Sequence, residues 1–225
     1  MYTYWLIPTV IAAGLQWYAR WRGHRWLHLI TKPAVMLLLL AWVWQSTHFE
    51  GFTGWIGLAL FFSLLGDILL MLPPSFFMAG LGAFLLGHIC FMLGFRVASL
   101  SGQPLLWGVG IVLLAMALYT QQYYWKVLKK KLYSKKVRSG VMLYIIIIHG
   151  MIFSAVSTFW QPEWSAVTAG LVAVGAVLFG ISDSTLAYNR FMNKIPNAHV
   201  WIMITYHMAQ MAMTLGVVLQ YFQMA

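Results

Sequence analysis

The sequence predicts an all-α protein, a polytopic bundle of membrane-spanning helices that forms a single domain over residues 1–225. Of the 225 residues, 62% are hydrophobic and only 8% are charged, whereas charged residues make up about a quarter of an average soluble domain. Eight apolar stretches are separated by short polar or Pro/Gly segments, and each is close to the roughly 20 residues that cross a bilayer core. These observations predict eight transmembrane helices.

The eight stretches follow one another with little chain between them. We place them near residues 2–18, 29–46, 52–72, 76–98, 105–125, 141–160, 164–188 and 199–222. No Lys or Arg precedes the first stretch, so it lacks the charged start of a signal peptide and is expected to be a retained span. The single cysteine, Cys90, lies within the fourth stretch. One cysteine can form neither an intramolecular disulfide nor a cysteine-rich zinc site, so both are excluded.

The positions of Lys and Arg predict the orientation, because cytoplasmic loops retain basic residues. If eight spans alternate in direction, every one of the 14 basic residues except Arg96 lies on one side. These residues are Arg20, Arg22, Arg25, Lys32, Lys126, Lys129, Lys130, Lys131, Lys135, Lys136, Arg138, Arg190 and Lys194. Both termini are therefore expected on the non-cytoplasmic side.

The net charge of +10 reflects scarce acids, since only 4 Asp and Glu residues stand against the 14 bases. We therefore expect no nucleic-acid partner and take the lipid bilayer as the surroundings of the chain. The cluster from Lys129 to Lys136 is sufficiently explained as a determinant of orientation, although it could also attract anionic phospholipid headgroups.

Two of the four acidic residues, Asp67 and Asp183, lie within predicted spans. An acid at membrane depth costs roughly 2.5–3.5 kcal/mol, so it indicates function by default. Each lies six residues before the expected cytoplasmic end of its span, which places both carboxyl groups about 9 Å inside that boundary at about 1.5 Å per residue. Equal depth allows them to converge on one site. The structural alternative is an interhelical hydrogen bond or an ion pair, most plausibly with Lys32.

Other polar side chains within the spans extend the candidate site. The candidates for substrate binding are Lys32, Ser63, His88, Tyr144, Ser182, Tyr206, His207 and Gln210. Tyr206 and Gln210 are four residues apart and share a helix face, and together with Lys32 they could bind a phosphate or glycerol group. For Lys32 the alternative is snorkelling to the interface, and for His88 and His207 it is hydrogen bonding within the bundle.

A zinc site is a further alternative. His88, His149 and His207 could in principle supply three ligands from separate helices. None of them has a second histidine four residues away, so we expect neither a metal nor any other cofactor.

Five motifs together resemble the lysoplasmalogenase family of integral membrane proteins, also called the YhhN or TMEM86-like family. They lie at residues 31–33, 65–70, 80–88, 178–184 and 206–210, and they contain Lys32, Asp67, His88, Asp183 and Tyr206 respectively. The resemblance extends from about residue 25 to residue 215, although the fifth and sixth stretches carry no matching motif. Their order and spacing make the match specific.

The resemblance implies hydrolysis of the vinyl ether bond of lysoplasmalogens, which releases a fatty aldehyde and glycerophosphocholine or glycerophosphoethanolamine. It also implies that Asp67 and Asp183 are catalytic. Such a protein is located in the inner membrane of a bacterium or in an endoplasmic-reticulum-type membrane of a eukaryote. Its headgroup preference and its oligomeric state are left open.

The expected chemistry divides the work between two carboxyl groups, one that protonates the alkene and one that stabilises the cation or activates water. We assign Asp67 as the proton donor because Gly66 and Ile68 offer it no hydrogen bonds, whereas Ser182 and Ser184 could keep Asp183 ionised. Two alternatives remain: a transporter or proton-coupled channel that uses the same Asp and His residues, and a zinc-dependent amidase or esterase.

Overall fold

The computed structural model describes residues 3–96 and 103–224, which form helices and no strand. The long helices are α1 (Leu6–Arg22), α2 (Arg25–Thr47), α3 (Thr53–Met71), α4 (Phe77–Phe95), α5 (Pro104–Lys130), α6 (Lys135–Ser157), α7 (Ala166–Phe191) and α8 (Ala198–Met224). Three short 3-10 helices precede α1, precede α4 and follow α6: η1 (Thr3–Trp5), η2 (Pro74–Phe76) and η3 (Thr158–Trp160). The all-helical class is as predicted.

Seven of the eight helices, α2 to α8, are long and apolar enough to cross a membrane. Helix α1 has 17 residues and ends with Arg20 and Arg22 in its last turn. An eighth span and the side of the membrane on which the termini lie therefore remain predictions. Residue 2 and residues 97–98, at the predicted ends of the first and fourth spans, lie outside the described residues.

Local sequence signals account for several helix boundaries. Gly23 follows α1 with φ +73°, a left-handed conformation that glycine adopts without strain. Ser134 begins α6 by accepting a hydrogen bond from the Val137 backbone N–H, and Ser165 begins α7 in the same way with Thr168.

Helices α5 and α6 extend further than predicted. The span expected to end at 125 continues to Lys130, and the one expected to begin at 141 starts at Lys135. Lysine is a good helix former, and a cation is also favourable in the last turn of α5, whereas α6 begins at its Ser134 N-cap. Most of the bases assigned to this loop therefore lie on the ends of the two helices.

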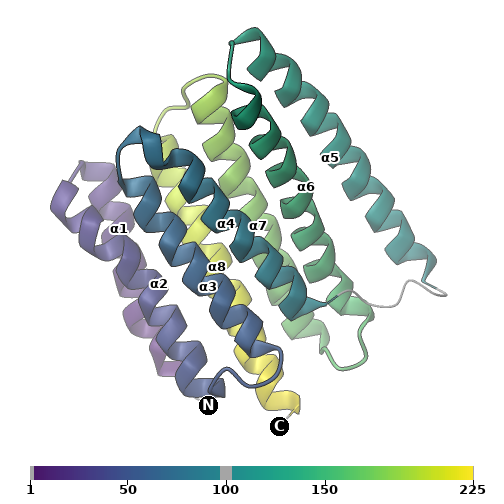
Figure 1. Cartoon of the computed structure of the whole chain (residues 1–225). Coiled ribbons are helices and arrows are strands. Elements are labelled where there is room, and N and C mark those ends of the chain that lie inside the picture. The colour runs from purple at the N-terminus through teal and green to yellow at the C-terminus, as the bar shows by residue number, and fades with distance from the viewer. Residues whose placement is uncertain (1–2, 97–102, 225) are drawn as a thin grey trace.

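Neighbouring helices run up and down the bundle, and α5 lies at its edge, where it packs against α6 (Figure 1). Helix α8 packs along α7 and also contacts α1, α2 and α3. Glycine permits the close approach of α7 and α8, because a Cβ atom on Gly175 would lie 2.8 Å from the Ala209 carbonyl oxygen. The start of α1 and the end of α8 lie at the same end of the bundle (Figure 1).

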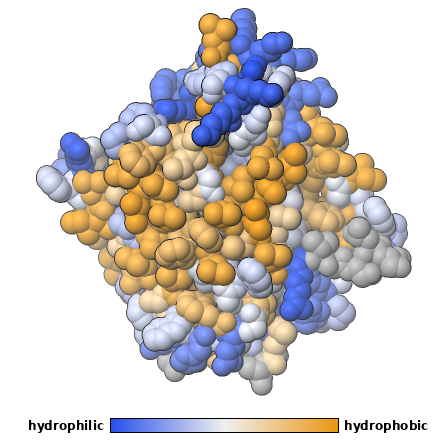
Figure 2. Space-filling model, in the orientation of Figure 1, coloured by the Kyte–Doolittle hydropathy of each residue, from blue (hydrophilic) through white to orange (hydrophobic). Residues whose placement is uncertain are grey.

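A broad apolar belt crosses the middle of the visible face, and hydrophilic residues gather at both ends of the bundle (Figure 2). The basic loops meet at one end, as alternating helices require. Lys131 Nζ donates to the carbonyl oxygens of Phe191 and Met192 at 2.8 Å, which joins the α5–α6 loop to the end of α7. His199, in the first turn of α8, bonds the Arg20 carbonyl oxygen at 3.1 Å.

Candidate active site

Asp67 lies on α3 in a buried ion pair. Lys32 Nζ of α2 is 3.2 Å from Asp67 Oδ1, and it also donates to the Asp67 carbonyl oxygen at 3.3 Å. The Tyr206 hydroxyl of α8 donates to Asp67 Oδ2 at 3.0 Å. The two charged side chains are 6% and 1% exposed, so Lys32 does not snorkel to the interface. The ion pair that the sequence offered as the structural alternative is present.

Asp183, on α7, has different partners. The Tyr144 hydroxyl of α6 donates to Asp183 Oδ2, and His88 Nε2 of α4 lies 3.3 Å from the same oxygen. His88 Nε2 also lies 2.9 Å from the Tyr144 hydroxyl, so the three groups form a compact network. The His88 side chain is 1% exposed, whereas that of Asp183 is 13% exposed. Three helices therefore converge on a carboxyl group that keeps access to open space.

Ser182 was considered as a group that could keep Asp183 ionised, but its hydroxyl has a different partner. Ser182 Oγ donates instead to the Ile202 carbonyl oxygen of α8 at 3.0 Å. Adjacent residues on a helix do not face the same way, so Ser182 faces α8 while Asp183 faces α4 and α6.

A polar cavity of about 210 Å³ lies between α1, α2, α3, α7 and α8 near the basic end of the bundle. Its polar lining consists of Arg20, His28, Lys32, Asp67, Ser182, Asp183, Asn189, His199 and Tyr206. Both aspartates of the candidate site thus face one space.

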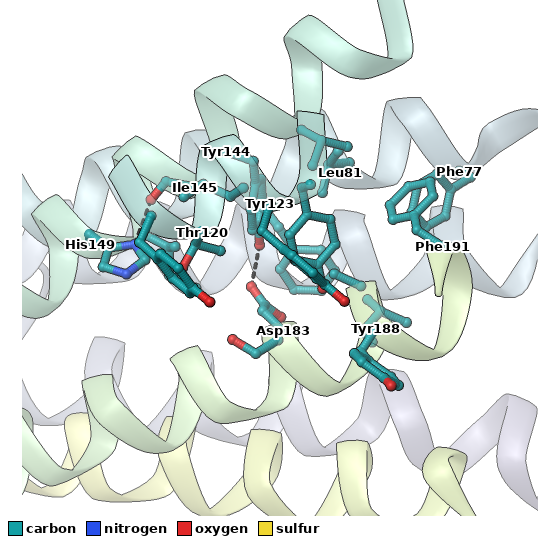
Figure 3. Close-up of a pocket in the computed structure, with 18 of the residues that line it drawn as sticks. Phe77, Leu81, Thr120, Tyr123, Tyr144, Ile145, His149, Asp183, Tyr188 and Phe191 are labelled. Carbon is teal, nitrogen blue, oxygen red and sulfur yellow. Dashed lines mark hydrogen bonds between the residues drawn. The ribbon is translucent and has the colours of Figure 1, made fainter. Parts of the chain in front are cut away.

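An apolar cavity of about 330 Å³ lies between α4, α5, α6 and α7. Figure 3 shows Tyr144 facing Asp183 in this cavity, with Thr120 and Tyr123 of α5 and His149 of α6 nearby. Four residues line both this cavity and the polar one: Leu70, Phe84, Asp183 and Leu186. Asp183 is the only titratable residue among these four, so it lies on the boundary between apolar and polar space.

A wider groove of about 570 Å³ continues from the apolar cavity along α6 and α7. The two share Ile148, His149, Ser184 and Tyr188. Val177 and Ile181, which also line the groove, are 44% and 47% exposed. The groove therefore opens on the apolar belt.

Comparison with known proteins identifies the family. The model of the YhhN family matches residues 27–217, which is most of the chain. This chain belongs to the YhhN family. The resemblance stated from the sequence motifs is confirmed.

Several YhhN-family relatives cover most of this chain. A protein of Mycobacterium bovis named lysoplasmalogenase is 30% identical over 95% of this chain and 78% of its own length. Human lysoplasmalogenase TMEM86B is 28% identical over 94% of this chain and 85% of its own length. The membrane protein YhhN of Escherichia coli O6:H1 is 30% identical over 79% of this chain and 80% of its own length. No solved structure matches. The relatives and the apolar helices together establish a multi-pass membrane protein.

Four predicted substrate-binding residues of this YhhN-family chain line neither cavity: Ser63, His88, His207 and Gln210. His88 is instead a hydrogen-bond partner of Asp183 and Tyr144. Gln210 Nε2 donates to Ser63 Oγ at 3.0 Å, and Trp17 Nε1 donates to His207 Nδ1 at 3.1 Å. Gln210 shares a face with Tyr206 but lies one turn, about 6 Å, further from the basic end. Ser63, His207 and Gln210 thus form hydrogen bonds between helices, and their assignment to the substrate stays a prediction.

The three histidines considered for zinc have separate partners. His88 bonds Asp183 and Tyr144, His149 Nδ1 bonds the Ile145 carbonyl oxygen at 2.7 Å, and His207 bonds Trp17. Residues 3–96 and 103–224 contain no group of three or more His, Cys, Asp and Glu side chains placed to hold a metal ion.

Four polar residues that line the polar cavity were not predicted as part of the site: Arg20, His28, Asn189 and His199. Arg20 was interpreted only as a marker of orientation. A usable signal was present, because Gln16 lies one helical turn before Arg20 and two polar residues at that spacing indicate an inward-facing polar stripe. Gln16 is indeed fully buried, with its Nε2 2.7 Å from His28 Nδ1.

Proposed function

We propose that this protein hydrolyses the vinyl ether bond of lysoplasmalogens to a fatty aldehyde and glycerophosphocholine or glycerophosphoethanolamine. The observation that carries the proposal is the position of Asp183, on the boundary between an apolar and a polar cavity. A lysoplasmalogen has the same division, with a hydrocarbon chain on one side of its vinyl ether and a charged headgroup on the other. The relatives named lysoplasmalogenase support the same substrate.

The chemistry requires an acid and water. Protonation of the alkene carbon remote from the ether oxygen gives an oxocarbenium ion. Water adds to the cationic carbon and loses a proton. In the resulting hemiacetal the bond to the glycerol oxygen breaks as the hydroxyl loses its proton and the glycerol oxygen gains one, which gives the fatty aldehyde and an alcohol. A carboxylic acid that donates the first proton can recover one from the attacking water, so the catalytic group returns to its starting state.

We assign Asp183 as the proton donor, which reverses the assignment made from the sequence. Asp183 borders both cavities, and the phenol and imidazole that hold its Oδ2 fix its orientation. Asp67 is paired with Lys32, which favours the carboxylate form. Asp67 therefore acts as the fixed negative charge that stabilises the oxocarbenium ion across the polar cavity.

The hydrocarbon chain is assigned to the apolar cavity and enters it through the groove along α6 and α7. Ala187→Phe places a ring among the residues that line this cavity. We expect kcat/KM for long alkenyl chains to fall roughly tenfold, equivalent to about 1.4 kcal/mol of lost binding, while shorter chains are affected less. The measurement is a chain-length series. Ala79→Phe, at an exposed position on α4, is the matched control. An equal loss of kcat/KM at all chain lengths would show that the hydrocarbon chain binds elsewhere.

Aldehyde release tests the function itself. Purified protein incubated with alkenyl- and acyl-lysophospholipids of equal chain length is expected to release fatty aldehyde from the alkenyl substrate alone. Fatty acid from the acyl substrate would indicate an esterase. Movement of a solute across liposomes without any aldehyde would instead indicate a transporter.

A further inference from the structure

We infer that the polar cavity is a phosphate-binding site in which Arg20 and His28 hold the phosphate diester of a lysophospholipid headgroup and His199 positions Arg20. None of the five sequence motifs contains Arg20, His28 or His199. The identity of the ligand as a lysophospholipid rests on the proposed function, whereas the recognition of a phosphate rests on the charges and geometry of the cavity.

Lys32 is not available to bind the phosphate, because it is paired with Asp67. Its ammonium group pairs with Asp67 Oδ1 at 3.2 Å and donates to the Asp67 carbonyl oxygen at 3.3 Å. A phosphate that drew Lys32 away would leave a carboxylate that is 1% exposed without its counter-charge, at high cost. The headgroup therefore needs a different cation.

Arg20 is that cation. It lines the polar cavity, and its Nε atom is buried with no hydrogen-bond partner among the described residues. The two ion pairs found in residues 3–96 and 103–224, Lys32–Asp67 and His88–Asp183, do not include it.

No other acidic side chain is close enough to neutralise Arg20. Of the four acids in the chain, Glu50 and Glu163 remain, and they lie by the far end of α8. Glu50 there accepts a hydrogen bond from Tyr221, and the Glu163 carbonyl oxygen accepts one from Gln220. An unpaired guanidinium in a cavity favours an anion, and its planar fork suits phosphate oxygens in particular.

Two histidines complete the cavity beside Arg20. Gln16 Nε2 donates to His28 Nδ1 at 2.7 Å, so a neutral His28 ring carries its hydrogen on Nε2 and can donate it to a phosphate oxygen. His199 Nε2 donates to the Arg20 carbonyl oxygen at 3.1 Å and fixes the end of α1. His199 is thus a positioning residue.

The distances along the helices match the ligand. His28 lies one turn, about 6 Å, from Lys32 toward the basic end, and Asn189 lies about 9 Å beyond Asp183 in the same direction. In a lysoplasmalogen the glycerol joins the ether oxygen to phosphorus through five bonds, which span roughly 6 Å at ordinary bond lengths. A vinyl ether at Asp183 therefore places the phosphate near Arg20 and His28.

The test uses two substrates that differ only in the phosphate: an alkenyl-lysophospholipid and the corresponding alkenylglycerol. For Arg20→Gln we expect KM for the phospholipid to rise roughly 10- to 100-fold, the ratio expected on losing a hydrogen bond to a charged group. Turnover of alkenylglycerol is expected to stay at the wild-type rate, which also shows that the variant is folded. Arg22→Gln, an exposed arginine two residues away, is the matched control and leaves both substrates unaffected. An equal change for both substrates, or no change, overturns the phosphate site.

A binding measurement separates this inference from the proposed function. Saturated alkyl-lysophospholipid and alkylglycerol are titrated into detergent-solubilised wild type and Arg20→Gln. Weaker binding of the phospholipid alone supports the phosphate site even if wild type releases no aldehyde, and equal binding by both proteins overturns it. Glycerophosphocholine and inorganic phosphate are then compared as competitors, and competition by either is expected to be lost in Arg20→Gln. The more effective competitor shows whether the site prefers a lipid headgroup or free phosphate.

Discussion

Asp183→Asn is expected to reduce aldehyde release from alkenyl-lysophospholipid by roughly 100- to 10,000-fold, the contribution of a general acid. An asparagine has the same shape and its carbonyl oxygen can still accept the Tyr144 hydrogen bond, so the network around His88 is expected to persist. The amide cannot protonate a carbon atom. The loss is therefore expected in kcat, with little change in KM, as steady-state kinetics on the purified variant will show.

Two companion variants make this result interpretable. Glu163→Gln makes the same change of carboxyl to amide far from both cavities and should retain wild-type turnover. Tyr144→Phe removes the phenol hydroxyl that bonds both Asp183 and His88 and should cost less than Asp183→Asn, because the acid itself remains. If Asp183→Asn folds and keeps more than a few per cent of wild-type activity, Asp183 is not the proton donor.

Lys32→Met is expected to lower the free energy of unfolding by about 3–5 kcal/mol, because breaking a buried ion pair leaves an uncompensated charge. Asp67 would keep only the Tyr206 hydroxyl as a partner for its carboxylate oxygens. The measurement is reversible unfolding in detergent. Lys130→Met, at an exposed position, is the control and should be close to neutral.

The double variant Lys32→Met/Asp67→Asn separates structure from chemistry. Removing both charges is expected to restore most of the stability, since an apolar or neutral pair of similar volume can replace a buried ion pair. Activity is not expected to return, because the charge proposed to stabilise the oxocarbenium ion is absent. A Lys32→Met protein as stable as wild type would show that the Lys32–Asp67 contact contributes nothing to the fold.

The sequence predicted helix type and approximate position well because length and hydropathy decide both in a membrane. Asp67 and Asp183 could be placed at one depth by counting residues along two helices of the same direction, and the structure has both on one cavity. Lys32 was also correctly named as the most plausible ion partner of a buried aspartate.

Rotation about the helix axis could not be predicted in the same way. When a helix is apolar on every side, the sequence does not show which face points into the bundle. Nothing therefore indicated that Tyr144 faces Asp183 or that Gln210 faces Ser63. Arg20 was missed for a related reason: a base at the end of a span serves equally as an orientation signal or as a ligand, and only its neighbours in space distinguish the two.

The position of Asp183 between two kinds of space bears on how products leave. The apolar cavity continues into a groove on the lipid-facing belt, whereas the polar cavity reaches exposed His199 at the basic end. Cleavage at Asp183 would thus send a lipid-soluble aldehyde into the bilayer and a water-soluble phosphodiester into the aqueous phase. Because the two products leave into different phases, they rarely occupy the site together. Their separation therefore slows the reverse reaction.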